Sequence, residues 1–487
     1  MSENDTPEAQ NNDADSADWK NITGRGDDEE PMNQPAPLDA FREAGDAVFA
    51  ELMQRVGEAQ PQPRLAPTRR ALDFLGDPQN SYPIIHLTGT NGKTSTSRMV
   101  ESIVRAYGLR TGLLTSPHLV RLNERIVIDG EPISDQILAA NWADIQPYLQ
   151  LVDSELEAAG DVPLTFFEAL TVLAFACFAD APVDVAVVEV GMGGEWDSTN
   201  VADGQVAVFT PIALDHTQRL GNTVAEIART KSGIIKPAAS VVSAAQSPEV
   251  QAELDRAAEL SESTLARENE GFELLSSTVA VGGQVISVRG LAGTYNELFL
   301  PLYGTHQAHN AAVAIAAVES FLGAGSQALV GDLLAEGLGT TTSPGRLQLV
   351  GIEPTVLVDA AHNPHGATAL AAALEAYFDF TEIAVVIGIL ADKDAQGIVS
   401  ALTTQVDRFY VTEPHSERAV RVDDLADNIA EWTNHQAIFR FDDVAAALDS
   451  AREWAAEAPR RAVLVTGSIV LVGEAITLAA AGEWMEK

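Results

Sequence analysis

The pattern of apolar and polar positions alternates between short apolar runs and longer segments with helical spacing. Apolar residues recur on one face over residues 38–56, which predicts a helix. From residue 82 onward, an apolar run at 83–88 leads into a glycine-rich turn and a helical segment at 95–107. Further apolar runs at 183–190, 206–210 and 241–244 predict buried strands. Because helices separate these strands, we expect an α/β fold with a mainly parallel sheet.

The pattern changes twice in the second half of the chain. Short runs between glycines over 274–300 predict a β-ribbon, and 303–323 returns to helix. A second series follows, with strands predicted at 347–350, 355–359, 383–387, 408–411, 438–441 and 462–466 and helices between them. We therefore place a domain boundary near residue 340. This gives an N-terminal domain at 37–340 and a smaller, Rossmann-like α/β domain at 341–487.

Composition narrows the class of protein. The chain has 487 residues, 70 of them acidic and 30 basic, so its net charge is −40. This charge argues against a broad nucleic-acid-binding surface and a polybasic membrane anchor. Residues 1–36 are polar and acidic with few apolar residues, which predicts a disordered acidic tail.

Cysteine use and the start of the chain bear on its location. Cys177 is the single cysteine, so no intrachain disulfide can form. The N-terminus has neither the basic region nor the apolar core of a secretory signal, and no apolar run is long enough to span a membrane. We expect a cytoplasmic protein with no nucleic-acid or membrane partner.

The glycine-rich turn predicts a phosphate-binding loop. It reads Gly89-Thr90-Asn91-Gly92-Lys93-Thr94 and lies between a predicted strand and a predicted helix. Glycines let backbone N–H groups surround an anion, and the helix N-terminus favours negative charge. Lys93 would reach the outer phosphates of ATP, and the hydroxyl of Thr94 or Ser95 would serve Mg²⁺. Leu87 stands where the strict pattern has glycine, so the loop is a variant. The alternative is a tight turn with a surface lysine.

Two residues at the ends of neighbouring strands are candidate Mg²⁺ ligands. Glu189 ends the apolar run 183–190, where a carboxylate is costly unless it holds a cation or a partner. His216 follows the next strand, and ligands gather at this edge of parallel sheets. The alternatives are a surface glutamate and a structural histidine. Beside a phosphate loop, we favour the metal site.

Further motifs follow in a fixed order along the chain. They are SPHL at 116–119, LTFFE at 164–168, EVGMGG at 189–194, DSTN at 197–200, LDH at 214–216, KSGI at 231–234, PGR at 344–346, DAAHNP at 359–364 and GILADKD at 388–394. Together with GTNGKTS at 89–95, they resemble the Mur ligase superfamily. SPHL, LTFFE and DSTN resemble its folate branch, the folylpolyglutamate and dihydrofolate synthases. The resemblance covers roughly residues 38–487.

The resemblance implies a reaction. In this family, ATP phosphorylates a carboxylate, and the amino group of L-glutamate then attacks the acyl phosphate. An amide forms, with release of ADP and phosphate. Phosphorylation supplies the leaving group that a carboxylate lacks, so catalysis rests on positioning and charge neutralisation. The acceptor would be dihydropteroate or a reduced folate. The family is usually monomeric, so we expect a monomer.

The resemblance also implies roles for the nucleotide and metal residues. Gly92, Lys93, Thr94 and Ser95 match its triphosphate loop, within a P-loop ATPase domain. Asn310, Arg346 and Asp359 match contacts to base, phosphate and ribose. Ser116, Glu189 and His216 match its Mg²⁺ ligands. Lys231 matches a lysine that is carbamylated and lies near a second Mg²⁺, whereas the sequence alone predicts an ordinary surface lysine of a helix.

The remaining roles concern the reacting groups and the acceptor. His362 would lie near the reacting groups or the incoming glutamate. Thr165, Phe167, Glu168 and Asp197 match the substrate pocket. There, Phe167 would stack on the pterin ring and Asp197 would accept hydrogen bonds from its amino-pyrimidine edge. For Phe167 the alternative is plain helix core.

Two positions depart from the family pattern. Thr94 stands where the family often has glycine, and Glu195-Trp196 stands where the folate branch commonly has Arg-Leu. The second departure bears on the substrate more than on the reaction. A peptidoglycan or cyanophycin-type ligase is the alternative enzyme, but those carry a separate domain before the phosphate loop. A nucleotide-binding regulator is the alternative outside catalysis, but Lys93, Glu189 and His216 are all present.

The net negative charge of the chain leads to one further prediction. ATP, folate and glutamate are anions, which an acidic exterior repels. We therefore expect a local cationic funnel built from Lys93, Arg125, Arg346 and bound Mg²⁺.

Overall fold

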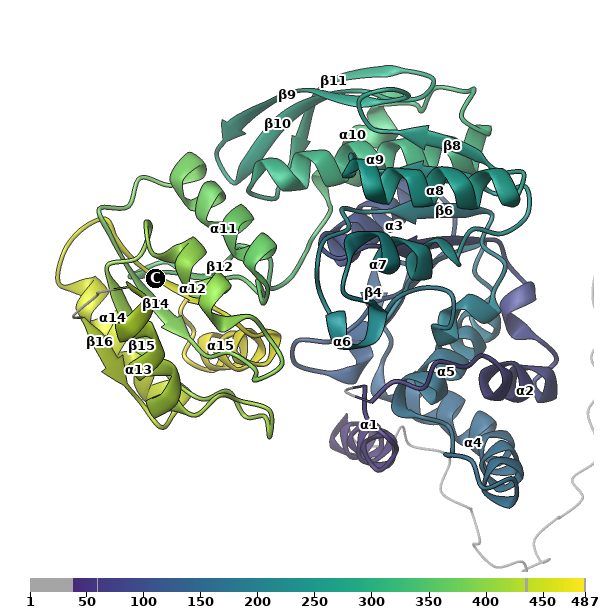
Figure 1. Cartoon of the computed structure of the whole chain (residues 1–487), viewed down its shortest axis with the longest axis horizontal. Coiled ribbons are helices and arrows are strands. Elements are labelled where there is room, and N and C mark those ends of the chain that lie inside the picture. Colours follow the sequence, from purple (N-terminus) through teal and green to yellow (C-terminus); the bar gives the residue numbers. More distant parts are fainter. Residues whose placement is uncertain (1–37, 59, 434–436, 486–487) are drawn as a thin grey trace, which may run out of the picture.

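The structure, a computed structural model, describes residues 38–58, 60–433 and 437–485. Within these residues the chain forms two lobes, each built around its own large sheet (Figure 1). The larger lobe takes the N-terminal part of the chain, and the smaller lobe takes the C-terminal part (green to yellow). The disordered tail predicted at 1–36 lies outside the described residues.

An eight-stranded sheet forms the centre of the larger lobe, in the order β4-β3-β2-β5-β1-β6-β7-β8. Its strands are β1 (Ile84–Thr88), β2 (Thr111–Leu114), β3 (Ile126–Ile128), β4 (Glu131–Pro132), β5 (Val185–Glu189), β6 (Val206–Phe209), β7 (Ser240–Ser243) and β8 (Thr264–Arg267). β1 lies between β5 and β6 and runs parallel to both. Only β3 and β4 run antiparallel to their neighbours. The predicted strands are confirmed, whereas β2, β3, β4 and β8 carry short or weakly apolar patterns and were not predicted.

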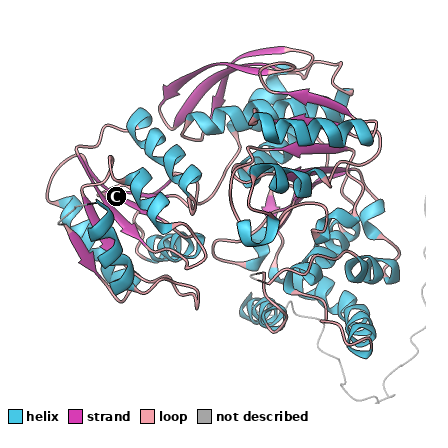
Figure 2. Cartoon of the chain, in the orientation of Figure 1, coloured by secondary structure: helices cyan, strands magenta, loops and turns pink. Residues whose placement is uncertain are grey.

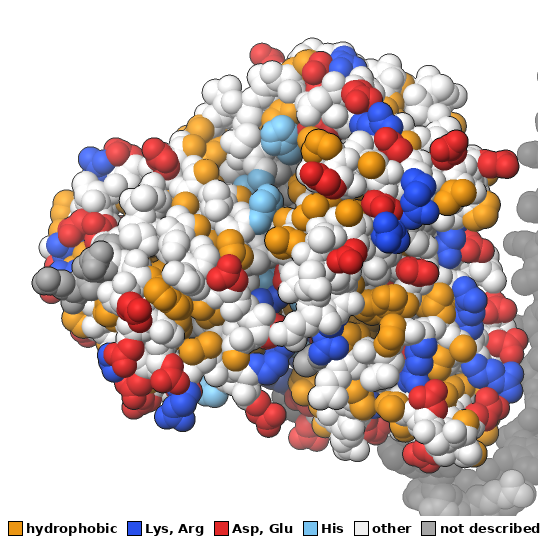
Figure 3. All heavy atoms as spheres, viewed as in Figure 1, with side chains coloured by type: hydrophobic (Ala, Val, Ile, Leu, Met, Phe, Trp, Pro, Cys, Tyr) orange, Lys and Arg blue, Asp and Glu red, His pale blue; other side chains and the backbone are white. Residues whose placement is uncertain are grey.

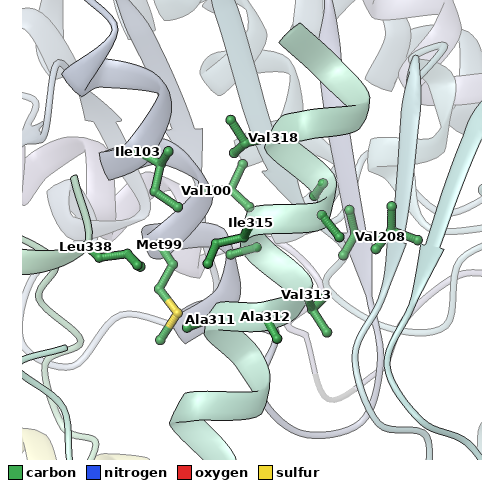
Figure 4. Close-up of a cluster of buried hydrophobic side chains, with 14 of the residues drawn as sticks. Met99, Val100, Ile103, Val208, Ala311, Ala312, Val313, Ile315, Val318 and Leu338 are labelled. Carbon is green, nitrogen blue, oxygen red and sulfur yellow. The ribbon is translucent and has the colours of Figure 1, made fainter. Parts of the chain in front are cut away.

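Helices cover both faces of this sheet, and β1 shows why. Its residues are all buried, with successive side chains on opposite faces. Ile85 and Leu87 pack with α3 (Lys93–Ala106) and α9 (Thr305–Gly323), whose contact is shown in Figure 4. Ile84 packs on the other face with α5 (Phe166–Asp180). The other helices of this region are α1 (Leu38–Met53), α2 (Ala66–Phe74), α4 (Asp135–Ala158), α6 (Thr217–Leu220), α7 (Val224–Ser232), α8 (Pro248–Leu260) and α10 (Gly331–Gly339), with short 3₁₀ turns η1 (Pro78–Asn80), η2 (Leu122–Arg125) and η3 (Ser198–Val201).

The predicted β-ribbon is a separate three-stranded antiparallel sheet. It consists of β9 (Glu273–Ala280), β10 (Gly283–Arg289) and β11 (Thr294–Leu300). It lies beside α9 and α10, at the top of Figure 1. The alternating burial of β10 and β11 follows from packing one face on these helices.

The smaller lobe holds a six-stranded sheet in the order β12-β13-β17-β14-β15-β16. Figure 2 shows the strands of this lobe (magenta) among its helices (cyan). Its elements are β12 (Gln348–Gly351), β13 (Thr355–Val358), α11 (Pro364–Tyr377), β14 (Glu382–Ile387), α12 (Ala395–Leu402), β15 (Arg408–Val411), α13 (Val422–Thr433), β16 (Ile438–Arg440), α14 (Val444–Ala456), β17 (Arg461–Thr466) and α15 (Ile469–Ala481). We predicted a helix between every two successive strands, and this prediction was wrong for one connection. β12 and β13 pair antiparallel across a turn that is too short for a helix.

The boundary predicted near residue 340 falls between α10 and β12, and the domain limits stay a prediction. None of the helices in the described part of the chain is long and apolar enough to cross a membrane.

Candidate active site

The glycine-rich loop joins the buried end of β1 to the start of α3. Gly92 has a φ of 88°, in the left-handed region that favours glycine. A Cβ at this position would lie 2.6 Å from Oδ1 of Asn310 on α9. Thr90 fixes the loop from the other side, because its hydroxyl donates to the Ala213 carbonyl at 3.0 Å. Asn310 and the segment after β6 therefore hold the loop in place from two sides. A fixed loop keeps its backbone N–H groups positioned for an anion.

Two lysines converge on one carbonyl of this loop. The Nζ atoms of Lys93 and Lys231 both donate to the carbonyl of Gly89, at 3.1 and 2.8 Å. Burial lowers the pKa of Lys93. Burial, and next the positive charge of Lys93, lowers the pKa of Lys231 to about 7. Lys231 is only 4% exposed, so the surface lysine predicted from the sequence alone was wrong. The fold instead places two lysine amines beside the loop on which phosphates would lie.

Glu189 ends β5 beside the same loop. Its side chain is buried, and Oε1 accepts a hydrogen bond from the Thr94 hydroxyl at 3.0 Å. Its other oxygen, Oε2, is buried without a hydrogen-bond partner among the described residues. Burial raises the pKa of Glu189, and the Ser116 backbone N–H and Lys93 oppose this rise. A buried carboxylate oxygen without a donor fits a bound cation.

The other predicted metal ligands lie around this carboxylate or on the neighbouring loop. Ser116 follows β2 and faces Glu189, and His216 lies in the loop after β6. Burial lowers the pKa of His216 to about 4, so its imidazole is neutral near pH 7 and suited to metal binding. Within residues 38–58, 60–433 and 437–485, no three His, Cys, Asp or Glu side chains are grouped to hold a metal. An ion at this edge would thus depend on hydroxyls, water and phosphate oxygens, as Mg²⁺ commonly does.

Asp215 connects the two lobes. Its Oδ1 lies 3.1 Å from Nζ of Lys393, and its Oδ2 accepts a hydrogen bond from Nδ2 of Asn363 at 3.2 Å. The Nε2 atoms of His216 and His362 each lie 3.9 Å from Oδ2. Burial would raise the pKa of Asp215, but the cationic surroundings outweigh it and hold the pKa well below its usual range. One carboxylate therefore gathers His362 and Lys393 of the smaller lobe beside the phosphate loop.

A second link crosses the lobes at the loop itself. The side-chain amides of Asn91 and Asn363 bond to each other, with Asn363 Nδ2 donating to Asn91 Oδ1 at 3.1 Å. Asn91 also contacts Nδ1 of His365 at 2.8 Å. Figure 3 shows histidine side chains (pale blue) gathered along the groove between the lobes. The candidate site thus lies at the lobe junction.

The nucleotide residues predicted in the smaller lobe lie at the start of that lobe. Asp359 follows β13 and accepts hydrogen bonds from the backbone N–H groups of Leu347 and Ala361, at 2.8 and 2.9 Å. These bonds fix the turn that carries Arg346. The Arg346 guanidinium has no hydrogen-bond or ion-pair partner in the part of the chain that the structure describes, and its charge lowers the pKa of Asp359 against the effect of burial. An uncommitted cation here suits a phosphate.

The predicted acceptor pocket centres on Gly191. A Cβ at this glycine would lie 2.5 Å from Cε1 of Phe167 and 3.2 Å from Oδ2 of Asp197. Phe167 is partly buried and packs against the hydrophobic core around α5. It therefore fits both alternatives, a core residue of the helix and a ring at the edge of the acceptor pocket. Burial raises the pKa of Asp197, while hydrogen bonds from Thr199 and Met192 oppose the rise. A ring and a carboxylate therefore face the same small residue.

Thr165 and Glu168 stabilise the start of α5. They form a capping box at the start of α5, in which Thr165 Oγ1 accepts from the Glu168 N–H and Glu168 Oε2 accepts from the Thr165 N–H. Glu168 also forms a two-point ion pair with Arg64, at 2.9 and 3.0 Å. The polar groups of both residues are thus engaged within the protein, and their substrate role stays a prediction.

Comparison with known proteins decides the family. Residues 87–318 match the Mur ligase middle domain, and residues 345–469 match the Mur ligase glutamate ligase domain. A dihydrofolate synthase/folylpolyglutamate synthase of Mycobacterium tuberculosis is 44% identical over 448 residues, which cover 88% of this chain and 92% of the relative. The chain belongs to the folate branch of the Mur ligase family.

Solved structures of Mur ligases show the same fold. Folylpolyglutamate synthase of M. tuberculosis, complexed with ADP, superposes with a TM-score of 0.86 at 44% identity and covers 90% of this chain and 99% of that one. Escherichia coli FolC, in complex with DHPP and ADP, has a TM-score of 0.75 at 30% identity and covers 92% and 99%. The predicted α/β fold is confirmed. The chain is an ATP-dependent glutamate ligase of the dihydrofolate synthase/folylpolyglutamate synthase type, as predicted.

The cations of this Mur ligase differ from those predicted. Arg125 is buried, bonded to both carboxylate oxygens of Glu58 at 2.7 and 2.9 Å, and its Nε donates to His118. It is therefore a structural residue and not part of an open funnel. Lys393 takes its place beside Lys93 and Arg346.

Three residues of the cross-lobe cluster were not predicted as site residues. Asp215, Asn363 and Lys393 each lie inside a recognised motif, but their partners come from the other lobe. The available signal was a charged or amide side chain in the loop that follows a strand of a parallel sheet.

Proposed function

We propose that this Mur ligase adds L-glutamate to dihydropteroate, to a reduced folate, or to both, through an acyl phosphate formed with ATP. The observation that carries this proposal is the phosphate loop beside two lysines, the partly buried Lys93 and the buried Lys231, and near a carboxylate, Glu189, with one unsatisfied oxygen. The relatives solved with ADP and with DHPP support it.

The phosphates of ATP would lie on the loop at 89–95, where Lys93 neutralises charge as it develops. Arg346 would reach the same phosphates from the smaller lobe. Ser116, Glu189 and His216 would hold Mg²⁺, and the unpartnered Oε2 of Glu189 fits that role. When bound, Mg²⁺ neutralises phosphate charge and orients the transferred group.

The acceptor would stack its pterin ring on Phe167 and direct its amino-pyrimidine edge toward Asp197, near Gly191. Glutamate brings two carboxylates, which need cations. Lys393, held by Asp215, is the candidate cation at the groove. His362 lies beside it, and because burial lowers its pKa to about 4, its imidazole is neutral near pH 7. Asp215 would keep both groups oriented toward the phosphate loop.

Lys231 would carry a carbamate. Its pKa of about 7 leaves much of the amine unprotonated near neutral pH, and the neutral amine can attack CO₂ and release a proton. A Lys231→Ala variant should lose activity and regain part of it with short carboxylic acids that replace the missing anion. Full activity of this variant without added acid would contradict the role.

The decisive measurement is ATP-dependent incorporation of labelled glutamate into dihydropteroate and, separately, into tetrahydrofolate. Product with both acceptors indicates a bifunctional enzyme, and product with one identifies the acceptor. Lys93→Met should abolish incorporation, whereas Arg229→Met, on an exposed ion pair of α7, should not. Absence of product with either acceptor, from wild-type protein that binds ADP, would contradict the proposed acceptors. A monomer in the cytoplasm remains our expectation.

A further inference from the structure

A buried chain of hydrogen bonds leads from the central strand of the sheet to the acceptor pocket. His86, in the middle of β1, contacts Thr199 through Nε2 and Oγ1 at 2.9 Å. Thr199 Oγ1 in turn contacts Oδ1 of Asp197 at 2.5 Å. All three side chains are buried, and His86 and Thr199 are both at 0% exposure. Neither His86 nor Thr199 has a role in the proposed mechanism so far.

The direction of these hydrogen bonds follows from the number of protons available. An ionised carboxylate only accepts, so the single hydroxyl proton of Thr199 must point to Asp197. His86 must therefore donate from Nε2 to Thr199. Burial, followed by the charge of Lys236, lowers the pKa of His86 to about 3, so the ring is neutral and carries one N–H. Its Nδ1 is then a bare acceptor, and this atom has no partner among the described residues.

An unsatisfied nitrogen makes His86 a costly choice for a core position. A buried polar atom without a hydrogen bond is unfavourable, and an apolar residue on β1 would avoid this cost. The neighbouring positions Ile84, Ile85 and Leu87 are all apolar and buried. The histidine is therefore explained by what its other nitrogen does, which is to orient Thr199.

The same face of β1 holds the acceptor segment at a second point. Thr88 lies two residues after His86, on the same face, and its hydroxyl donates to the Gly193 carbonyl at 2.7 Å. Asp197 also accepts from the Met192 N–H at 2.9 Å. The strand that ends in the phosphate loop thus braces the segment 191–199 at both ends. Any shift of the Asp197 carboxylate would have to break one of these contacts.

We propose that His86 is a positioning residue for the acceptor, which fixes the Asp197 carboxylate through Thr199 so that it can receive the amino-pyrimidine edge of the pterin ring. This inference rests on the proposed function, because it requires the pterin ring beside Asp197. The ligand class it concerns is a heterocycle with adjacent N–H and amino donors. The phosphate loop and the glutamate groups are unaffected by it.

Two pairs of variants separate this role from plain core packing. His86→Gln keeps a donor near the position of Nε2, whereas His86→Asn moves the amide toward the position of Nδ1 and loses that donor. Thr199→Ser keeps the hydroxyl, whereas Thr199→Val keeps the shape and loses it. His86→Asn and Thr199→Val should raise the KM for the pterin acceptor about tenfold, with the KM for ATP unchanged. The Gln and Ser variants should recover most of this loss.

An acceptor without the 2-amino group of the pterin supplies the control within the substrate. If His86 acts through Asp197, the tenfold penalty should shrink to less than twofold with this analogue, because the donor that Asp197 receives is gone. Thermal unfolding and ADP binding show whether each variant is folded. An equal penalty on both acceptors, or a changed stability with an unchanged acceptor KM, would overturn the inference. If wild-type protein accepts no pterin substrate at all, the proposed function fails instead.

Discussion

Glu189, the last residue of β5, and Asp197, in the segment that follows, are two buried carboxylates with different surroundings. Burial raises the pKa of both. Asp197 accepts hydrogen bonds from the N–H and hydroxyl of Thr199 and from the N–H of Met192. Glu189 accepts one from the Thr94 hydroxyl, and its Oε2 has no partner within the described structure.

The difference shows how a fold separates recognition from chemistry. A carboxylate whose hydrogen-bond donors all come from the protein is fixed in place before any substrate binds, and it can form a rigid part of a binding site. A buried carboxylate with an unsatisfied oxygen is costly until a cation completes it. In the proposed function, Asp197 would therefore form a fixed part of the acceptor pocket, and Glu189 would hold the cation that accompanies the nucleotide.

Replacement of Glu189 should give the largest effect. Glu189→Gln removes the charge that the cation requires, so kcat should fall roughly 10³-fold. The free energy of unfolding of the ligand-free protein should stay the same or rise, because a buried charge is removed. ADP release during glutamate addition and denaturant unfolding measure the two effects. Glu131→Gln on the exposed strand β4 is the control. Activity of Glu189→Gln within tenfold of wild type would contradict a role of Glu189 in cation binding.

Asp215 is a third carboxylate at this edge, and its partners come from the other lobe. Asp215→Asn should lower kcat/KM for glutamate about 100-fold, because Lys393 and His362 lose the group that orients them. Steady-state kinetics with varied glutamate tests this. Asp423→Asn, which breaks the exposed pair with Arg440, should leave the kinetics unchanged. Equal effects of the two variants would mean that Asp215 does not orient Lys393 and His362 for glutamate binding.

Asp197→Asn should affect binding and stability more than chemistry. Asparagine has one acceptor oxygen where several donors converge, so the free energy of unfolding should fall by about 2 kcal/mol. The KM for the acceptor should rise roughly thirtyfold, with kcat reduced far less than in Glu189→Gln. Acceptor titrations at saturating ATP and denaturant unfolding measure both. A large loss of kcat at unchanged acceptor KM would place Asp197 in the chemistry and undo the comparison.

The last prediction concerns the stability of the ligand-free protein without CO₂, in which Lys231 is a free amine. The unfolded chain protonates this amine below its usual pKa of 10.5, whereas the folded chain does so only below about 7. Between these values the unfolded state binds more protons, so wild-type stability falls as pH is lowered from 10.5 to 7 and then levels off. Lys231→Met lacks this loss and should be more stable than wild type by about 2 kcal/mol at pH 7. Urea unfolding at pH 7, 8 and 9 measures the difference, which should shrink as pH rises. A difference independent of pH would contradict the depressed pKa.

Much of this protein follows from local sequence. The apolar run before Gly89 and the helical pattern after Lys93 determine strand, loop and helix, because both periodicities depend on near neighbours. The position of Glu189 at a strand end followed in the same way, since parallel strands bring their carboxyl ends to one edge. Motif order then identified the ligase family and its reaction.

Tertiary packing decided the rest, because it joins residues that no local pattern relates. Asp215 and Lys393 are 178 positions apart, and His86 and Thr199 are 113 apart. Tertiary packing also buried Lys231 against the Gly89 carbonyl and paired Arg125 with Glu58. Whether a polar atom is satisfied depends on every neighbour in three dimensions. For that reason, the sequence could locate Glu189 and Asp197, but only the folded chain shows that protein donors reach both oxygens of Asp197, whereas Oε2 of Glu189 has no partner among the described residues.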